Sequence, residues 1–303
     1  MSDLVWGPIL AGYLFLGGLA GGAFVVGALV DLFKNEDYDV LSKSGTYISL
    51  VTIIVGLVLL VFDLKRFQVA PLVILGAYKR FPDSIMSVGT WIITVFTVVS
   101  LLTTFLWLFN GNKLIRKLLD IIGIILGLST AAYTGLLLSF SRGSPFWSSP
   151  FLSWTFIISG ILTGLAVSLF LIPIIAIFMP RAFKDFLMVF EQKSTLSNML
   201  YRSQRYVTIL ILIELALVLI DVFTGHGAGI LLTGSISIAF YTYLLLGLII
   251  PLGISYYLVK QFSPLARAND GSILLFSMSG YALILLGGFL LRYVILIGGQ
   301  LVF

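Results

Sequence analysis

The sequence predicts an all-α integral membrane protein with eight transmembrane helices. Of its 303 residues, 59% are hydrophobic and only 10% are charged, and the mean hydropathy is +1.12. The charged residues cluster between long apolar runs, eight of which are long enough to cross the hydrocarbon of a bilayer. A soluble domain cannot bury so much apolar surface. The lipid bilayer is therefore the environment in which we expect this chain to fold.

The eight predicted spans follow one another through short connections. The first begins after Met1 to Trp6, which contain no lysine or arginine, so we interpret it as a retained helix rather than a signal peptide. Residues 69–75 are apolar but too short to cross, which favours an interfacial or re-entrant segment. Residues 181–205 mix basic, acidic and apolar side chains, which predicts an amphipathic surface helix. The predicted spans are residues 8–32, 46–64, 88–109, 118–140, 153–178, 206–223, 231–258 and 272–298.

A weak internal repeat relates the two halves of the chain. Residues 15–22 of span 1 and residues 157–164 of span 5 have similar patterns of glycine and apolar residues, and the spans that follow them end near Asp63 and Asp221. Four spans per half would make this a parallel repeat of two four-helix bundles. The predicted bundles are residues 1–145 and 146–303.

The distribution of basic residues predicts the orientation. Twelve of the 18 lysines and arginines fall in the connections after spans 1, 3, 5 and 7, and five fall on the opposite side. The positive-inside rule then places both termini outside. Four of the five outer basic residues lie in the connection after span 2, which is either an ordinary solvated loop or a basic docking surface for a partner. The five are Lys65, Arg66, Lys79, Arg80 and Arg142.

Three ionisable residues lie near the outer ends of predicted spans: Asp63, Asp221 and Arg292. A charge near hydrocarbon is costly unless it is paired, hydrated or able to change its protonation state. Their common depth predicts a polar pocket beneath the outer surface. Arg292 cannot readily lose its proton, so we expect it to pair with Asp221 or Asp63.

Two acid positions have both structural and functional interpretations. Asp63 and Arg66 share a helical face at a spacing of three. They form either a local ion pair, or a carboxylate that accepts and releases protons while Arg66 holds its pKa or contacts a ligand carbonyl. Glu214 lies near the middle of span 6, and Asp221 follows two turns later, about 10 Å along the axis. Glu214 is either a hydrogen-bonded structural acid or a stepping stone for protons.

Small and hydroxyl-bearing residues supply the other candidates. Tyr133 and Thr134 place hydroxyl groups in the outer third of span 4, and a buried phenol needs a hydrogen-bond partner, although a packed structural tyrosine is an alternative. The pairs Gly17/Gly21 and Gly18/Gly22 are small-xxx-small patterns that favour close helix packing. The minority interpretation is a ligand that approaches bare backbone at this position.

Composition excludes several classes of function. The chain has no cysteine, which excludes disulfides, thiolate metal sites and iron–sulfur clusters of the usual kind, and its single histidine cannot supply the two axial ligands of a membrane haem. If the chain handles electrons, it must use a diffusible carrier or a partner's cofactor. The net charge of +5 indicates basic loops rather than affinity for nucleic acid.

Four stretches of the sequence stand out in order along nearly the whole chain. They are residues 13–24 (YLFLGGLAGGAF); 62–66 (FDLKR) with 82–91 (PDSIMSVGTW); 133–139 (YTGLLLS) with Trp147; and 287–293 (GGFLLRY) with Gly299 and Gln300. In residues and in order, these stretches resemble the polysulfide-reductase membrane-subunit (NrfD-like) family. Lys65 and Phe67 stand where that family commonly has glycine and proline.

The resemblance implies a quinone-interacting anchor in a prokaryotic cell membrane. Such subunits pair with an iron–sulfur subunit and a molybdopterin catalytic subunit, commonly on the outer face, and exchange electrons with the membrane pool of menaquinone or another quinone. The first bundle would hold the quinone site, without a haem or iron–sulfur cluster in this chain.

For the residues, the resemblance implies that Tyr133 hydrogen-bonds a quinone oxygen and that Asp63 or Asp221 accepts a proton. Glu214 would extend a proton path inward and so support proton translocation. The alternatives are a proton-coupled secondary transporter, or a passive anchor that binds no quinone. The remaining residues expected to border the site are Arg66, Arg292, Gly17 and Thr134.

Overall fold

The computed structural model describes residues 6–33, 38–63, 76, 78–140, 144–179, 183–224, 228–261 and 271–301. These residues are largely helical and include no strand, and eight of their helices are long and apolar enough to cross a membrane. The predicted fold class is therefore confirmed. The described elements are α1 (Pro8–Phe33), α2 (Asp39–Asp63), α4 (Ile85–Leu108), α5 (Lys113–Ser139), η2 (Pro145–Ser148), α6 (Leu152–Phe178), α7 (Lys184–Glu191), α8 (Lys193–Thr224), α9 (Ala228–Thr233), α10 (Ser237–Thr242), η3 (Tyr243–Ile249), α11 (Ile250–Gln261) and α12 (Gly271–Gln300).

Several predicted boundaries are wrong: the second span begins at Asp39 rather than at residue 46, and the seventh begins at Ser237 rather than at residue 231. The sixth span does not begin at residue 206, because α8 already begins at Lys193 and runs unbroken to Thr224. Residues 181–205 therefore do not form one surface helix: only the short α7 is separate, and it buries Phe186 against the bundle. The fourth span begins at Lys113, before the predicted residue 118. Residues 69–75 lie outside the described part of the chain.

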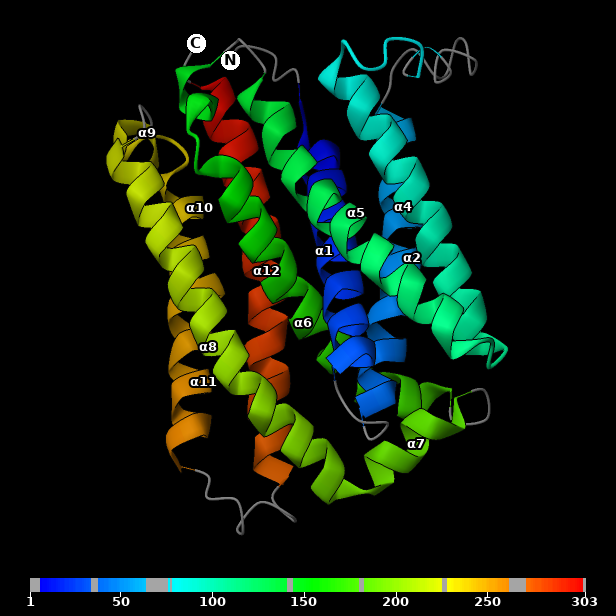
Figure 1. The fold of residues 1–303 in the computed structure, drawn as a ribbon. Coiled ribbons are helices and arrows are strands. Elements are labelled where there is room, and N and C mark those ends of the chain that lie inside the picture. The colour runs from blue at the N-terminus through cyan, green and yellow to red at the C-terminus, as the bar shows by residue number, and fades with distance from the viewer. Residues whose placement is uncertain are drawn as a thin grey trace.

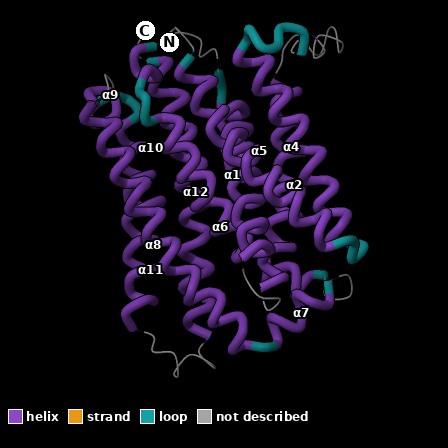
Figure 2. Tube along the Cα trace, in the orientation of Figure 1, coloured by secondary structure: helices purple, strands orange, loops and turns teal. Residues whose placement is uncertain are grey.

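Helices α1 and α6 lie at the centre of the bundle, with α2, α4 and α5 on one side and α8, α11 and α12 on the other (Figures 1 and 2). Both ends of the chain lie at the same end of the molecule, which we call the outer end in keeping with the predicted orientation. There the Trp6 amide donates to Gln300 Oε1 at 2.9 Å, and Gln300 Nε2 donates to the Trp6 carbonyl at 3.0 Å. The opposite end is called the inner end.

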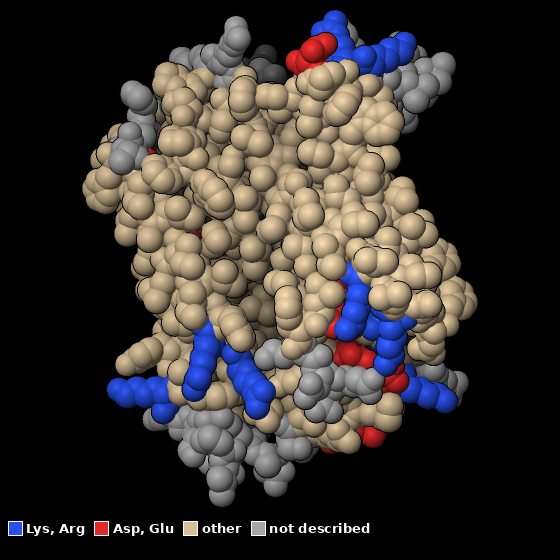
Figure 3. All heavy atoms as spheres, in the orientation of Figure 1, with Lys and Arg blue, Asp and Glu red and all other residues tan. Residues whose placement is uncertain are grey.

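Charged side chains on the visible face gather toward the two ends, and an apolar band separates them (Figure 3). The outer charges lie over the connection between α2 and α4, and basic side chains are prominent at the inner end. This distribution is the one expected of a bundle whose middle section faces hydrocarbon.

Glycines of α1 allow its close contacts with two neighbours. A Cβ atom on Gly21 would overlap the carbonyl of Gly127 in α5, and one on Gly22 would overlap the carbonyl of Gly160 in α6. Lipid offers no hydrophobic drive for helices to associate, so close backbone packing supplies much of the stabilisation. The predicted packing role of these glycines is confirmed.

Because of this packing, the effect of Gly22→Ala on stability should be opposite to the usual effect of replacing glycine by alanine in a helix. Alanine normally stabilises a helix by about 1 kcal/mol relative to glycine. At Gly22 the overlap with Gly160 should instead destabilise the protein by about 1–3 kcal/mol. Gly253→Ala is the matched control, because nothing lies within 4 Å of its added Cβ atom. Thermal unfolding in mild detergent should rank Gly22→Ala below wild type and Gly253→Ala at or above it, and equal behaviour would contradict the packing argument.

Candidate functional site

Two buried tyrosines from different helices lie in the outer half of the first four spans. Tyr133 of α5 is 6% exposed and Tyr13 of α1 is 2% exposed. The Tyr133 ring lies against Gly89 of α4, where any side chain would overlap it, and Tyr13 lies against Gly56 of α2. No side-chain hydrogen bond acts on either hydroxyl within the described residues. Two buried phenols thus retain hydrogen-bonding capacity that the described protein does not use.

Thr134 and Gly17 form the edge of this region on the side of α1. The Thr134 hydroxyl donates to the Ala131 carbonyl at 2.7 Å, so its proton is used within its own helix. Its methyl group lies 3.6 Å from the position of a Cβ atom on Gly17. Thr134 can therefore accept a hydrogen bond from a ligand, whereas its donor is already engaged.

Arg292 is the largest side chain with no exposed surface among the described residues, and it lies among α1, α6 and α12. Its Nη1 donates to Ser159 Oγ at 2.6 Å and to the Gly288 carbonyl at 2.9 Å. Its Nη2 reaches the Phe156 carbonyl at 3.4 Å, and the guanidinium lies 5.2 Å from the Phe156 ring centroid. A Cβ atom on Gly18 would lie 2.9 Å from Nη2, so this glycine provides the space for the guanidinium.

The acid that acts on Arg292 is Glu214, not the predicted Asp221. Glu214 is 1% exposed, and its Oε1 accepts from the Tyr243 hydroxyl at 3.0 Å. The charges of Glu214 and Arg292 act on each other, and the Ser159 hydroxyl lies beside both. Glu214 Oε2 and Arg292 Nε have no hydrogen-bond partner among the described residues. Of the two predicted partners, Asp221 is therefore not the acid that acts on Arg292, and the side chain of Asp63 lies outside the described residues.

The other predicted acids lie further toward the outer end. Asp221 is partly buried in the last turns of α8 and interacts with Ser149, which precedes α6. Asp63 is the last residue of α2, and its side chain lies outside the described residues. Arg66 and the single histidine, His226, also lie outside them.

The predicted site residues thus fall into two groups on either side of α1. Tyr133, Thr134 and Gly17 lie with the first four spans, whereas Arg292 of α12 and Glu214 of α8 lie with α6 and η3. The adjacent residues Gly17 and Gly18 face the two groups, so one turn of α1 separates them. The sequence suggested a single pocket, and the structure instead shows a phenolic region and a charged cluster side by side.

Sequence reasoning missed several members of these groups. Tyr13 opens the glycine-rich stretch of span 1 but had no assigned role, and Ser159 lies within the repeat at span 5. Tyr243 begins the π-helical turn η3. Such turns are rare and often occur at functional sites, but no local pattern announces them.

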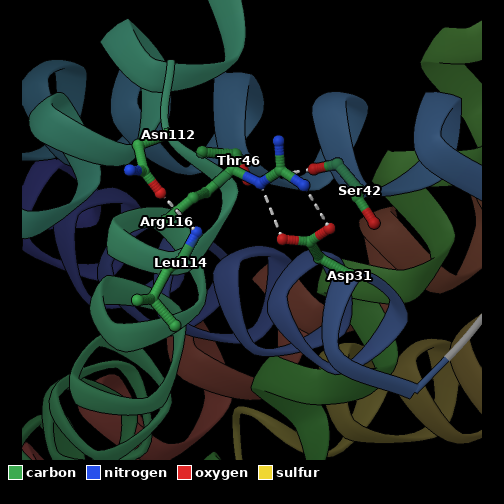
Figure 4. A network of polar contacts seen from close by, with 6 residues as sticks. All are labelled: Asp31, Ser42, Thr46, Asn112, Leu114 and Arg116. Atoms are coloured by element: carbon green, nitrogen blue, oxygen red, sulfur yellow. Dashed lines mark hydrogen bonds and ion pairs between the residues drawn. The ribbon is translucent and has the colours of Figure 1, made fainter. Parts of the chain in front are cut away.

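A third polar cluster, at the inner end, was also missed (Figure 4). Arg116 of α5 donates from Nε and Nη2 to the two carboxylate oxygens of Asp31 in α1, both at 2.7 Å. Asp120 follows Arg116 by one turn and is 0% exposed. The spacing of four between Arg116 and Asp120 was a usable signal, but Arg116 was counted as a loop residue. None of these groups forms a metal-binding cluster within the described part of the chain.

Comparisons with known proteins place the protein in a family. The family model described as polysulphide reductase, NrfD, matches residues 1–303. The sequence is 30% identical to the C subunit of polysulfide reductase from Wolinella succinogenes over 55% of its own length and 58% of that protein. It is 28% identical to protein NrfD of Escherichia coli, over 55% of its own length and 59% of that protein. It is 29% identical to an NrfD homolog of Haemophilus influenzae, over 57% of its own length and 60% of that protein. Each match spans less than two thirds of the relative's length. On the match over all 303 residues, the chain belongs to the polysulphide reductase NrfD family.

Proposed function

We propose that this chain is the quinone-interacting membrane anchor of a multi-subunit respiratory oxidoreductase in a prokaryotic cell membrane. Quinol would be oxidised beneath the outer surface, and its two electrons would pass to an iron–sulfur subunit that serves a molybdopterin enzyme on the outer face. Family membership and the eight spans support an anchor of this kind. The observation that carries the quinone assignment is the pair of buried phenols, Tyr13 and Tyr133, on which no side-chain hydrogen bond acts within the described part of the chain.

The phenolic region suits a flat ring with a carbonyl oxygen. Such an oxygen has two lone pairs, so Tyr13 and Tyr133 can both donate to it. Gly89 and Gly56 carry no side chain, so the rings of Tyr133 and Tyr13 lie directly against them. The tyrosines would hold and orient the ring, and their burial would exclude water from the oxygen that gains or loses a proton.

Acids near the outer end are suited to receive the protons released on oxidation. Asp63 ends the helix that carries Gly56, two turns further outward. Asp221 lies near the outer end of α8. Glu214 is deeper, held by Tyr243 and balanced by Arg292, which suits an acid that passes a proton inward rather than one that releases it at once.

A photoreactive quinone analogue tests the binding site directly. The intact complex is purified in mild detergent from native membranes, its subunits are identified, and its iron is counted. After illumination, we expect labelled peptides from α1 and α5 that contain Tyr13 and Tyr133, in competition with unlabelled quinone. A matched reaction in the presence of excess quinone is the control for non-specific labelling.

The same preparation separates the alternatives. Iron in fixed proportion, with a cysteine-rich partner and competed labelling, supports the proposal. Labelling elsewhere in the chain would refute the phenolic site. A monodisperse protein without iron that drives flux into sealed vesicles would instead establish a proton-coupled transporter.

A further inference from the structure

The inner cluster contains a second, unexplained carboxyl group. Asp31 lies in the last turns of α1, and the fork of Arg116 occupies both of its oxygens (Figure 4). Arg116 also stacks on the Trp107 ring of α4, with 3.5 Å between its guanidinium carbon and the ring centroid. This pair alone is balanced in charge and satisfied in hydrogen bonds. An ionised Asp120 would add a negative charge to a pair that is already neutral.

Asp120 has no partner to compensate an ionised carboxylate. It is 0% exposed, and neither of its oxygens has a hydrogen-bond partner among the described residues. Its carboxyl lies within hydrogen-bonding reach of Asp31. Two ionised carboxylates carry no hydrogen and cannot bond to each other, but one proton placed between them creates a donor and removes the repulsion.

The remaining charged groups near the cluster do not neutralise Asp120. On α5, Lys117 acts on it from an exposed position where solvent screens its charge. On α2, Lys43 is bound to Asp185 of α7 and lies 5.4 Å from the Trp107 ring centroid. Of the two described cations that act on Asp120, Arg116 is therefore already engaged by Asp31, and Lys117 is exposed to solvent.

We propose that Asp31 and Asp120 form a proton-binding site that exchanges with the inner aqueous phase. One proton from that phase binds a carboxylate oxygen of Asp120 and is shared with Asp31, and on release it returns to the same phase. With the proton bound, Arg116 and the two acids together are neutral, as a buried cluster at the edge of hydrocarbon requires. The site does not depend on quinone chemistry.

A surface cavity provides the approach from the inner side. It has a volume of about 270 Å³ and includes Lys43, Asn110, Lys184 and Trp107 in its lining. Trp107 is the residue on which Arg116 stacks, so the cavity and the cluster share one wall. Ser42, with no exposed surface and no described partner for its hydroxyl, lies beside Arg116 and Asp31 and adds a polar group to the cluster (Figure 4).

Apolar packing separates the cluster from the outer half of the molecule. Ser49 and Ser100 meet at 3.4 Å between α2 and α4. One turn further outward, Ile53 and Phe96 are fully buried, and the ring centroid of Phe24 lies 5.6 Å from that of Phe96. In this arrangement protons reach the carboxyl pair from the inner side, while the phenolic region lies beyond the apolar layer.

Infrared difference spectroscopy of the intact complex tests the site. A pH change should reveal the carbonyl stretch of one protonated carboxylic acid, which disappears in Asp120→Asn. Asn has the same shape as Asp and leaves the Arg116–Asp31 pair in place, so this variant should fold. Glu191→Gln is the matched control, because Glu191 is an exposed acid of α7 at the same end of the molecule. A band that persists unchanged in Asp120→Asn, or the absence of any such band in wild type, would overturn the proposal.

The side of exchange is tested in sealed vesicles of known orientation. The same band should follow the pH of the compartment that faces Lys184, and it should not respond when only the other compartment is changed. A response to the compartment that faces the termini would refute exchange from the inner side. Neither measurement uses quinol turnover, so the proton site and the quinone site can fail independently.

Discussion

Replacing Arg292 with methionine should destabilise the protein strongly, by about 3–5 kcal/mol, because the change leaves Glu214 without its countercharge. Both side chains are almost completely buried. Methionine fills much of the same volume but donates no hydrogen bond to Ser159 or to the Gly288 carbonyl. Thermal unfolding in detergent measures the loss, and Arg202→Met, at an exposed position of α8, is the control for substitution itself.

A double-mutant cycle tests the assignment of Glu214 as the partner. Glu214→Gln removes the charge that Arg292 balances and keeps an acceptor for the Tyr243 hydroxyl. Combined with Arg292→Met, it should recover most of the lost stability, because no uncompensated charge then remains. Strictly additive losses would show that another acid balances Arg292. Asp221→Asn in the same background provides the comparison, and we expect it to recover little.

The acid beside Arg292 was predicted incorrectly, because the depth of a residue along its helix does not determine which residue of a neighbouring helix it meets. Spacing alone puts Glu214 and Asp221 on the same face of one span, two turns apart, and it puts Arg292 in the outer part of span 8. Which acid meets Arg292 depends on how far α8 is displaced along its axis relative to α12 and on its rotation. Both are fixed by tertiary packing, including the early start of α8 at Lys193, and hydropathy contains no information on either.

The glycine motif of α1 was predicted from the sequence, whereas the inner cluster was not. Gly21 and Gly22 were predicted to pack helices closely, because a small-xxx-small pattern has few other uses in lipid. Their partners, Gly127 and Gly160, were not predicted. Asp31, by contrast, lies far from Arg116 and Asp120 in the sequence. Their meeting could not be predicted, and the late boundary assigned to span 4 placed Arg116 outside the membrane.

Removing the phenol hydroxyls should lower quinol-linked turnover without unfolding the protein. Tyr13→Phe and Tyr133→Phe keep the rings that pack against Gly56 and Gly89. Each loses one donor, which we expect to reduce kcat/KM about tenfold, as one hydrogen bond of ordinary strength corresponds to roughly 1.4 kcal/mol. Tyr256→Phe is the matched control, because that phenol is exposed near the inner end.

The double variant distinguishes one shared oxygen from two separate roles. If both hydroxyls donate to the same oxygen, removing one should strengthen the remaining bond, and the double loss should differ from the product of the single losses. Gly89→Ala adds a test that keeps both hydroxyls, because its Cβ would displace the Tyr133 ring. Turnover should then fall although both hydroxyls are still present, because only the position of the Tyr133 ring is altered. Full activity in the double variant, with the complex still assembled, would refute the phenolic site, since no other donor in the proposal could take over both contacts.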